Sequence, residues 1–236
     1  MYTFRAVKAY KDMYRPVLAV DCIIFGFQEG RLNLLLIRRD FEPRRGEWSL
    51  MGGFLRKNES LDEAAARVLQ ELTGLHDVYL EQFRAFGDVD RDEGERTVSV
   101  GYYALVNQEE AQVQLSSDYA AQWVPLTDIP PLIFDHTEMV KAALRRLRHR
   151  ATHEPVGFEL LPGKFTLTQL QSLYEAIFGT PIDAGNFRRR LRKMDYLQRL
   201  DEKDTTNSRK GAWYYQFVSE GYALAKRNGS DFLLKP

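Results

Sequence analysis

The sequence predicts an α+β protein of two domains, and three observations support this prediction. Strand-like segments with a single helix among them fill about the first 130 residues, and a segment rich in Pro and Gly follows at residues 152–163. Beyond it, two helical segments separated by a Gly-containing break precede a strand–loop–strand pattern. We therefore place the domains at residues 1–152 and 153–236.

Composition restricts the class of protein. The chain has 236 residues, 44% of them hydrophobic, which is enough for two cores. Residues 151–236 hold 13 Lys+Arg against 10 Asp+Glu, leaving 20 against 23 in the first 150. The single cysteine, Cys22, cannot form an internal disulfide, and no run of 18 apolar residues occurs. We expect a cytoplasmic protein with no membrane role.

The strands of the first domain are indicated by apolar runs between turns. VLAVDCIIFGF and RLNLLLIRR, joined by Gln28-Glu29-Gly30, predict a hairpin. VYLEQFRAFG and RTVSVGYYALV predict two further strands, and Trp123-Val124-Pro125-Leu126 predicts a short edge strand. Together they predict a mixed sheet.

One helix lies among these strands. Ser60 with Glu63 forms a capping box at its start, and Gly74 ends it. An apolar stripe at helical spacing predicts that the helix packs on the sheet; it consists of Leu61, Ala65, Val68 and Leu72.

A motif overlaps this helix. In GFLRKNESLDEAAARVLQELTGL, residues 53–75, five residues stand in the spacing of a Nudix box, the loop–helix–loop that holds the catalytic metal in pyrophosphohydrolases: Gly53, Glu59, Arg67, Glu71 and Gly74. The resemblance to the Nudix superfamily implies a Nudix-type α/β/α sandwich. Val68 and Leu72 stand where the family has two glutamates.

These two replacements argue against hydrolysis. Positions 68, 71 and 72 share one side of the helix, where carboxylates can converge on Mg²⁺, and only Glu71 remains. We therefore predict no enzymatic activity, no catalytic residue, no metal and no cofactor. An active hydrolase that uses another acid, such as Asp92, stays open as an alternative.

A further helix, TEMVKAALRRLRHR at residues 137–150, closes the first domain. Its apolar residues lie on one side and its basic residues on the other. The preceding pair, Asp135 and His136, is placed to cap it.

The second domain has the pattern of a winged helix-turn-helix. Its first helix opens with a Thr166–Gln169 capping box and ends at Gly179-Thr180-Pro181, and Asp183 is an N-cap for AGNFRRRLRKMDYL. YLQRL and AWYYQFV, separated by a polar loop, predict the wing.

The second of these helices is strongly basic. Five of the six residues 188–193 are Arg or Lys, which favours a recognition helix at 183–195 in the DNA major groove. The alternative is a solvated face in a winged helix that binds protein. The predicted DNA contacts are Asn186, Arg188, Arg189, Arg190, Arg192, Lys193, Arg209 and Lys210.

The whole chain resembles the Nudix-related transcriptional regulators, in which a degenerate Nudix domain senses a small molecule and a C-terminal winged helix binds operator DNA. The resemblance implies a homodimer on double-stranded operator DNA. It also implies a pentose sugar or ADP-ribose as effector. GEWSLMGGF and neighbouring stretches look closer to the arabinose-responsive branch, so a pentose is preferred and ADP-ribose is the alternative. A third alternative is a scaffold protein that uses its winged helix to bind other proteins.

The effector pocket is expected beside the box, at strand ends that face it. An aromatic floor with a few fixed polar groups suits either ligand. Each residue also has an ordinary role as core or surface. The predicted pocket residues are Arg38, Trp48, Gly52, Gly53, Glu71, Phe86, Asp88, Arg91 and Tyr103.

Overall fold

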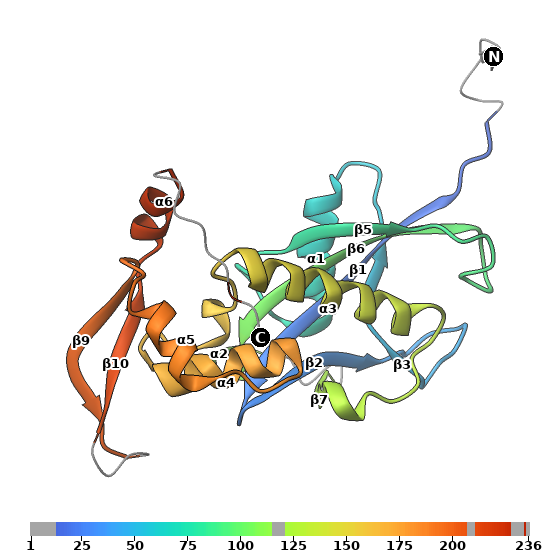
Figure 1. Cartoon of the computed structure of the whole chain (residues 1–236). Helices are drawn as coiled ribbons and strands as arrows, with labels where there is room; N and C mark the ends of the chain where they lie inside the picture. The colour runs from blue at the N-terminus through green and yellow to red at the C-terminus, as the bar shows by residue number, and fades with distance from the viewer. Residues whose placement is uncertain (1–12, 115–120, 207–210, 228–233, 235–236) are drawn as a thin grey trace.

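The computed structural model describes residues 13–114, 121–206, 211–227 and 234, and it has the predicted α+β architecture (Figure 1). In the first domain a mixed sheet carries α1 (Leu61–Thr73) on one face and α3 (His136–His153) on the other. A second domain of helices and a three-stranded sheet follows. Every helix among the described residues is too short or too polar to span a lipid bilayer.

The large sheet is built around its longest pair of strands, β1 and β6. These two run parallel, and their register sets Asp21 beside Gly101. The order is β3-β2-β1-β6-β5, with β4 also on β1 and β7 also on β2. The strands are β1 (Val17–Gln28), β2 (Arg31–Arg38), β3 (Trp48–Ser49), β4 (Met51–Phe54), β5 (Glu81–Phe86), β6 (Thr97–Asn107) and β7 (Gln122–Pro125).

Local signals in the sequence place several of these elements correctly. The β1–β2 hairpin turns at Glu29 and Gly30, whose φ angles of 51° and 75° match the twist of two-residue hairpins. The predicted capping box of α1 is present, with Ser60 accepting from the backbone of Glu63. Gly74 ends that helix in the left-handed region, at φ 82°.

The second domain also follows its sequence signals. Thr166 and Gln169 form the predicted capping box of α4 (Leu167–Phe178), and Asp183 caps α5 (Ala184–Leu191). The wing is a small sheet in the order β8-β10-β9. Its strands are β8 (Phe165–Thr166), β9 (Leu197–Asp204) and β10 (Ala212–Phe217), and α6 (Ser219–Arg227) follows them.

Two short helices carry no sequence prediction, α2 (Gln108–Gln114) and α6. Helical periodicity is hard to detect over seven and nine residues. Two 3₁₀ turns, Leu126–Asp128 and Phe158–Leu160, complete the elements. The second turn lies in the Pro/Gly segment, whose Val156 and Leu160 are buried, so this segment is a packed connector.

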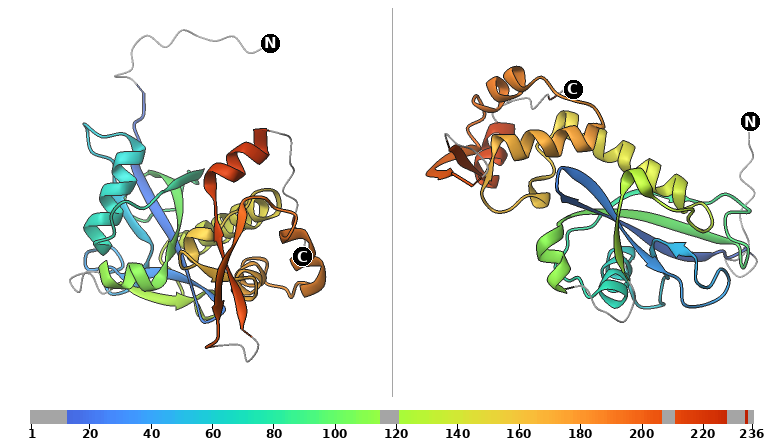
Figure 2. Two further views of the ribbon diagram at one scale, coloured as in Figure 1. Left: turned by 90° about the vertical axis from the view of Figure 1, so that its left-hand side faces the viewer. Right: turned by 90° about the horizontal axis from the view of Figure 1, so that it is seen from below.

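The two domains share one continuous core. Side chains of β1, β2 and α3 belong to the same buried cluster as side chains of α4 and α5. Arg148 on α3 donates through Nε to the carbonyl of Ile177 on α4 at 2.7 Å. Tyr174 on α4 donates to the carbonyl of Val156 at 3.1 Å. Helix α3 therefore packs against α4, as the views of Figure 2 show.

Candidate functional site

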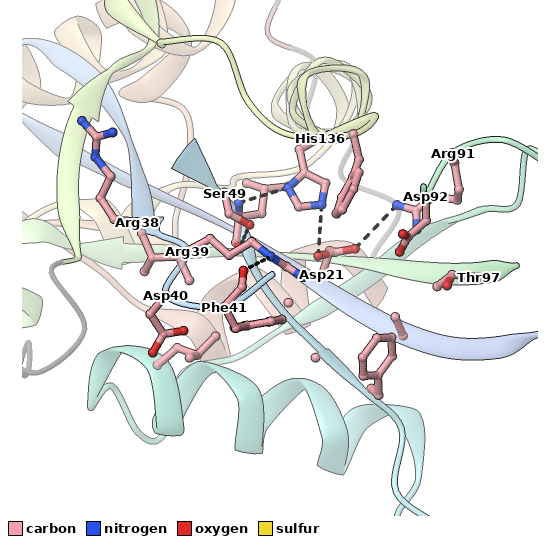
Figure 3. Close-up of a pocket in the computed structure, with 18 residues that line it drawn as sticks. Asp21, Arg38, Arg39, Asp40, Phe41, Ser49, Arg91, Asp92, Thr97 and His136 are labelled. Atoms are coloured by element: carbon pink, nitrogen blue, oxygen red, sulfur yellow. Dashed lines mark hydrogen bonds and ion pairs between the residues drawn. The ribbon is translucent and has the colours of Figure 1, made fainter. Parts of the chain in front are cut away.

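A cavity of about 310 Å³ lies beside the box, between the sheet and the start of α3 (Figure 3). Strands β1, β2, β3, β4 and β6, helices α1 and α3, and the loops that hold residues 39–41, 91–92 and 134 contribute to it. Its lining is Ala19, Asp21, Ile37, Arg38, Arg39, Asp40, Phe41, Ser49, Leu50, Gly52, Gly53, Phe54, Leu72, Arg91, Asp92, Thr97, Phe134 and His136.

The polar floor of the cavity is Asp21, in the middle of β1. Its Oδ2 accepts a hydrogen bond of 2.5 Å from Ser99 Oγ on β6. On the other side, its partner in the β1–β4 register is Gly52, where an added Cβ would collide with Asp21 Oδ1. The missing side chain at Gly52 therefore leaves room for the carboxylate in the cavity.

His136 lies directly across from Asp21. The backbone N–H of Leu50 donates to His136 Nδ1 at 3.2 Å, so the ring proton of the neutral imidazole is on Nε2. Nε2 lies 3.6 Å from Asp21 Oδ1. Burial lowers the pKa of His136 despite the attraction of Asp21 and Asp135. The structure thus presents a neutral N–H donor toward the cavity.

Arg91 forms the third part of this polar group, and it is almost fully buried. Its guanidinium donates two hydrogen bonds to the carboxylate of Asp135, of 3.0 and 2.6 Å. Asp135 stands at the N-cap position of α3 but makes no side-chain cap bond, so the predicted capping role is wrong. The carboxylate pairs with Arg91 instead, whose Nη2 also lies 3.8 Å from Asp21 Oδ2.

Aromatic and cationic groups lie beside these residues, and the ring of Phe134 meets that of His136 edge to face, with the centroids 5.8 Å apart. The Arg39 guanidinium stacks on Phe41, 3.8 Å from the ring centroid, and lies 5.7 Å from the ring of Phe134. Phe134 holds φ at 51°, a left-handed conformation that bulky residues rarely adopt. These flat groups offer stacking surfaces and a cation to a ligand.

The carboxylates that remain in the box are bound by arginines. Arg67 contacts Glu59 at 2.6 Å and Glu71 at 3.0 Å, and Arg56 contacts Glu71 at 3.1 Å. The Arg67 hydrogen bond lowers the pKa of Glu59 to about 2. Val68 is buried and packs where a Cβ on Gly53 would be. Among the described residues, no three acidic, His or Cys side chains gather as a metal site.

Four of the nine predicted pocket residues line the cavity, and the other five lie outside its lining. Arg38, Gly52, Gly53 and Arg91 line the cavity. Trp48 lies outside the lining, and the guanidinium carbon of Arg38 lies over its ring, 4.0 Å from the ring centroid. Glu71 is held in the ion pairs described above.

Three more of the predicted pocket residues lie outside the lining. Phe86 is buried in the core next to Phe83. Tyr103 faces the far end of α3 and accepts a hydrogen bond from Arg150, because it lies two residues further along β6 than Gly101. Asp88 is exposed outside the cavity, where its carbonyl accepts from Arg96. Sequence reasoning also missed Asp21, Arg39, Phe41, Phe134 and His136.

The basic residues of α5 are exposed, as predicted, while Phe187 and Leu191 face the core. The helix ends at Leu191, earlier than the predicted 195, because Tyr196 turns into an aromatic cluster with Phe217 and Tyr222. Arg192 and Lys193 therefore lie in the turn after the helix, also exposed. Arg209 and Lys210 lie outside the described residues.

Contacts on α5 hold two of these side chains in place. Arg189 Nη2 donates to Asn186 Oδ1 at 2.6 Å. Arg188 reaches Thr168 on α4 at 3.4 Å. Asn186, Arg188, Arg189 and Arg190 thus lie together on the exposed face of α5, which is predominantly basic.

Comparison with known protein families gives two matches. The NUDIX domain family matches residues 15–147, and the NrtR DNA-binding winged helix domain family matches residues 157–217. The ADPR responsive transcriptional repressor NtrR of Acinetobacter baylyi is 34% identical over 223 residues, covering 93% of this chain and 89% of that protein. An ADP-ribose pyrophosphatase of Methanocaldococcus jannaschii is 30% identical over 142 residues, covering 60% of this chain and 80% of that protein.

Solved structures are similar over the same extent. Shewanella oneidensis NrtR complexed with a 27mer DNA has a TM-score of 0.78 and 34% identity, covering 87% of this chain and 95% of that one. The NUDIX domain of the same protein complexed with ADP ribose has a TM-score of 0.53 and 34% identity, covering 60% of this chain and 95% of that one.

Proposed function

The chain belongs to the NrtR family of Nudix-related transcriptional regulators, and on that premise we propose that it is a repressor that ADP-ribose releases from operator DNA. The observation that carries the proposal is the position of α3. One end of this helix presents His136 to the cavity, and the other end packs on α4 of the winged helix.

The DNA-binding part of the proposal rests on α5. Its exposed arginines are suited to phosphates and to the acceptor edge of guanine, and Asn186 is suited to adenine. The winged-helix relative that was solved with DNA supports this assignment. We keep the predicted contacts of α5 and of the following turn as the proposed DNA face.

The effector part rests on the cavity. Arg39, with Phe41 and Phe134, provides a cation and flat surfaces, which suit a pyrophosphate linked to an adenine ring. Asp21 and His136 provide hydrogen bonds for a sugar. The preference for a pentose rests on the resemblance of GEWSLMGGF and neighbouring stretches to the arabinose-responsive branch. The cation at Arg39 and the relatives that respond to or bind ADP-ribose favour the alternative instead.

Hydrolysis is the competing function, because one relative is a pyrophosphatase. Val68 and Leu72 supply no ligand to a divalent cation, and the carboxylate of Glu71 is already paired with Arg67 and Arg56. We therefore propose a sensor that binds its effector without metal. A homodimer, a cytoplasmic location and the boundary between residues 152 and 153 remain part of this proposal.

Metal independence gives a direct test of effector binding. Calorimetric titration of the full chain with ADP-ribose should give the same Kd, within about twofold, in EDTA and in Mg²⁺, because the residues that the structure describes form no carboxylate cluster that could bridge the ion to phosphate. L-arabinose is titrated in parallel. Binding of L-arabinose alone would restore the pentose reading, and affinity that appears only with Mg²⁺, together with turnover, would favour the hydrolase.

A further inference from the structure

We propose that Asp21 is the specificity-determining residue of the cavity, where it and His136 together bind one hydroxyl group of a ribose. This inference deepens the proposed function and rests on it.

The space between His136 and Asp21 fits one small group. His136 Nε2 and Asp21 Oδ1 are 3.6 Å apart, too far for a direct hydrogen bond but close enough for one small atom to contact both. The backbone of Leu50 fixes Nε2 as the protonated nitrogen. The pair therefore consists of a donor and an acceptor that share one small space.

The chemistry of this pair selects a hydroxyl group. A hydroxyl can accept from His136 and donate to Asp21 at the same time. A phosphate oxygen has no proton for Asp21 and would be repelled by the carboxylate, and an ammonium group cannot accept from His136. Of the groups in ADP-ribose, a ribose hydroxyl is therefore the one that satisfies both partners.

Buried neighbours hold the carboxylate of Asp21 in position. Asp21 is only 5% exposed, and Ser99, which is fully buried, donates to its other oxygen. Its neighbours across both adjacent strands are glycines, Gly52 on β4 and Gly101 on β6. Ser99 and Arg91 thus both lie at Oδ2 of Asp21. Oδ1 faces His136, as the close-up of the cavity shows (Figure 3). A buried polar group fixed in this way has a high cost if the ligand leaves it unpaired.

The test compares ligands that differ by one hydroxyl. The full chain is titrated by calorimetry with ADP-ribose, with the five deoxy analogues that each lack one of its ribose hydroxyls, and with free L-arabinose. Wild type should bind ADP-ribose about 10- to 150-fold more tightly than one deoxy analogue, which corresponds to a hydrogen bond to a charged group. The analogue that loses affinity identifies which ribose lies on Asp21, and tight L-arabinose binding would identify a free sugar as the source of the hydroxyl.

Asp21→Asn keeps the size of the side chain and should reduce this ratio to within about twofold. Asp128→Asn, the same change at an exposed position outside the cavity, should keep the wild-type ratio. Ser99→Ala leaves Asp21 in place but loosens it, and should give an intermediate ratio. Ser99→Ala also serves as the test if Asp21→Asn does not fold.

The outcomes separate the two proposals. If wild type does not bind ADP-ribose, the proposed function fails. If it binds ADP-ribose and all five deoxy analogues equally, or if Asp21→Asn retains the wild-type ratio, the Asp21 assignment is overturned and the proposed function stands. Equal tightening of all phosphate-bearing ligands by Asp21→Asn would mean that Asp21 only repels phosphate, which also overturns the assignment.

Discussion

Replacing Arg188 and Arg189 together with alanine should nearly abolish operator binding, at a cost of about 2 to 6 kcal/mol if the two effects add. Both side chains are exposed on α5, and neither contributes to the core formed by Phe187 and Leu191. The fold should therefore survive the change. Fluorescence anisotropy with an operator selected by this protein from random DNA measures the loss, and a salt series separates phosphate contacts from base contacts.

The matched control removes two arginines elsewhere. Arg45→Ala plus Arg145→Ala changes the net charge equally, at two exposed positions in the first domain. We expect this control to bind the operator with nearly wild-type affinity. Equal losses in the two double variants would mean that net charge, and not α5, governs binding, which contradicts the proposed recognition helix.

Restoring one family glutamate, by Val68→Glu, should lower the free energy of unfolding by about 3–5 kcal/mol without creating a hydrolase. Val68 is 2% exposed, in a cluster with Val20, Cys22 and Ala65, and it fills the space beside Gly53. A carboxylate there would be buried with no cationic partner among these apolar neighbours. Urea unfolding curves measure the change.

Leu72→Glu is the comparison, because Leu72 is only partly buried and lines the open cavity. Leu72→Glu should lower the free energy of unfolding by clearly less than Val68→Glu does. A Val68→Glu cost below about 1 kcal/mol would show that this side of α1 still accommodates a carboxylate. The claim that the box now serves as core would then be wrong.

Local signals explain what could be predicted from the sequence. Capping boxes, N-caps and end glycines act within a few residues, so α1, α4 and the start of α5 follow from them. The spacing of the box, from Gly53 to Gly74, predicts the first domain because each position has one structural role. The basic run on α5 is visible for the same reason, since exposure follows from helical spacing beside Phe187 and Leu191.

The cavity could not be predicted in the same way, because its groups come from distant parts of the chain. Asp21 meets Ser99 through the parallel pairing of β1 with β6, and His136 arrives with α3. An acid in the middle of the apolar run AVDCIIF is a signal of a buried polar site, but it does not identify the partners. Tyr103 shows the converse error, since a position on β6 near the site faces the other end of α3.

The central claim, that the cavity controls the winged helix, is tested most directly by operator affinity with and without ADP-ribose, in EDTA. Coupling of about 1 to 3 kcal/mol corresponds to a roughly 5- to 150-fold change. We predict that saturating ADP-ribose weakens operator binding by a factor in that range. An operator affinity that stays the same, while calorimetry shows ADP-ribose bound, would contradict the claim.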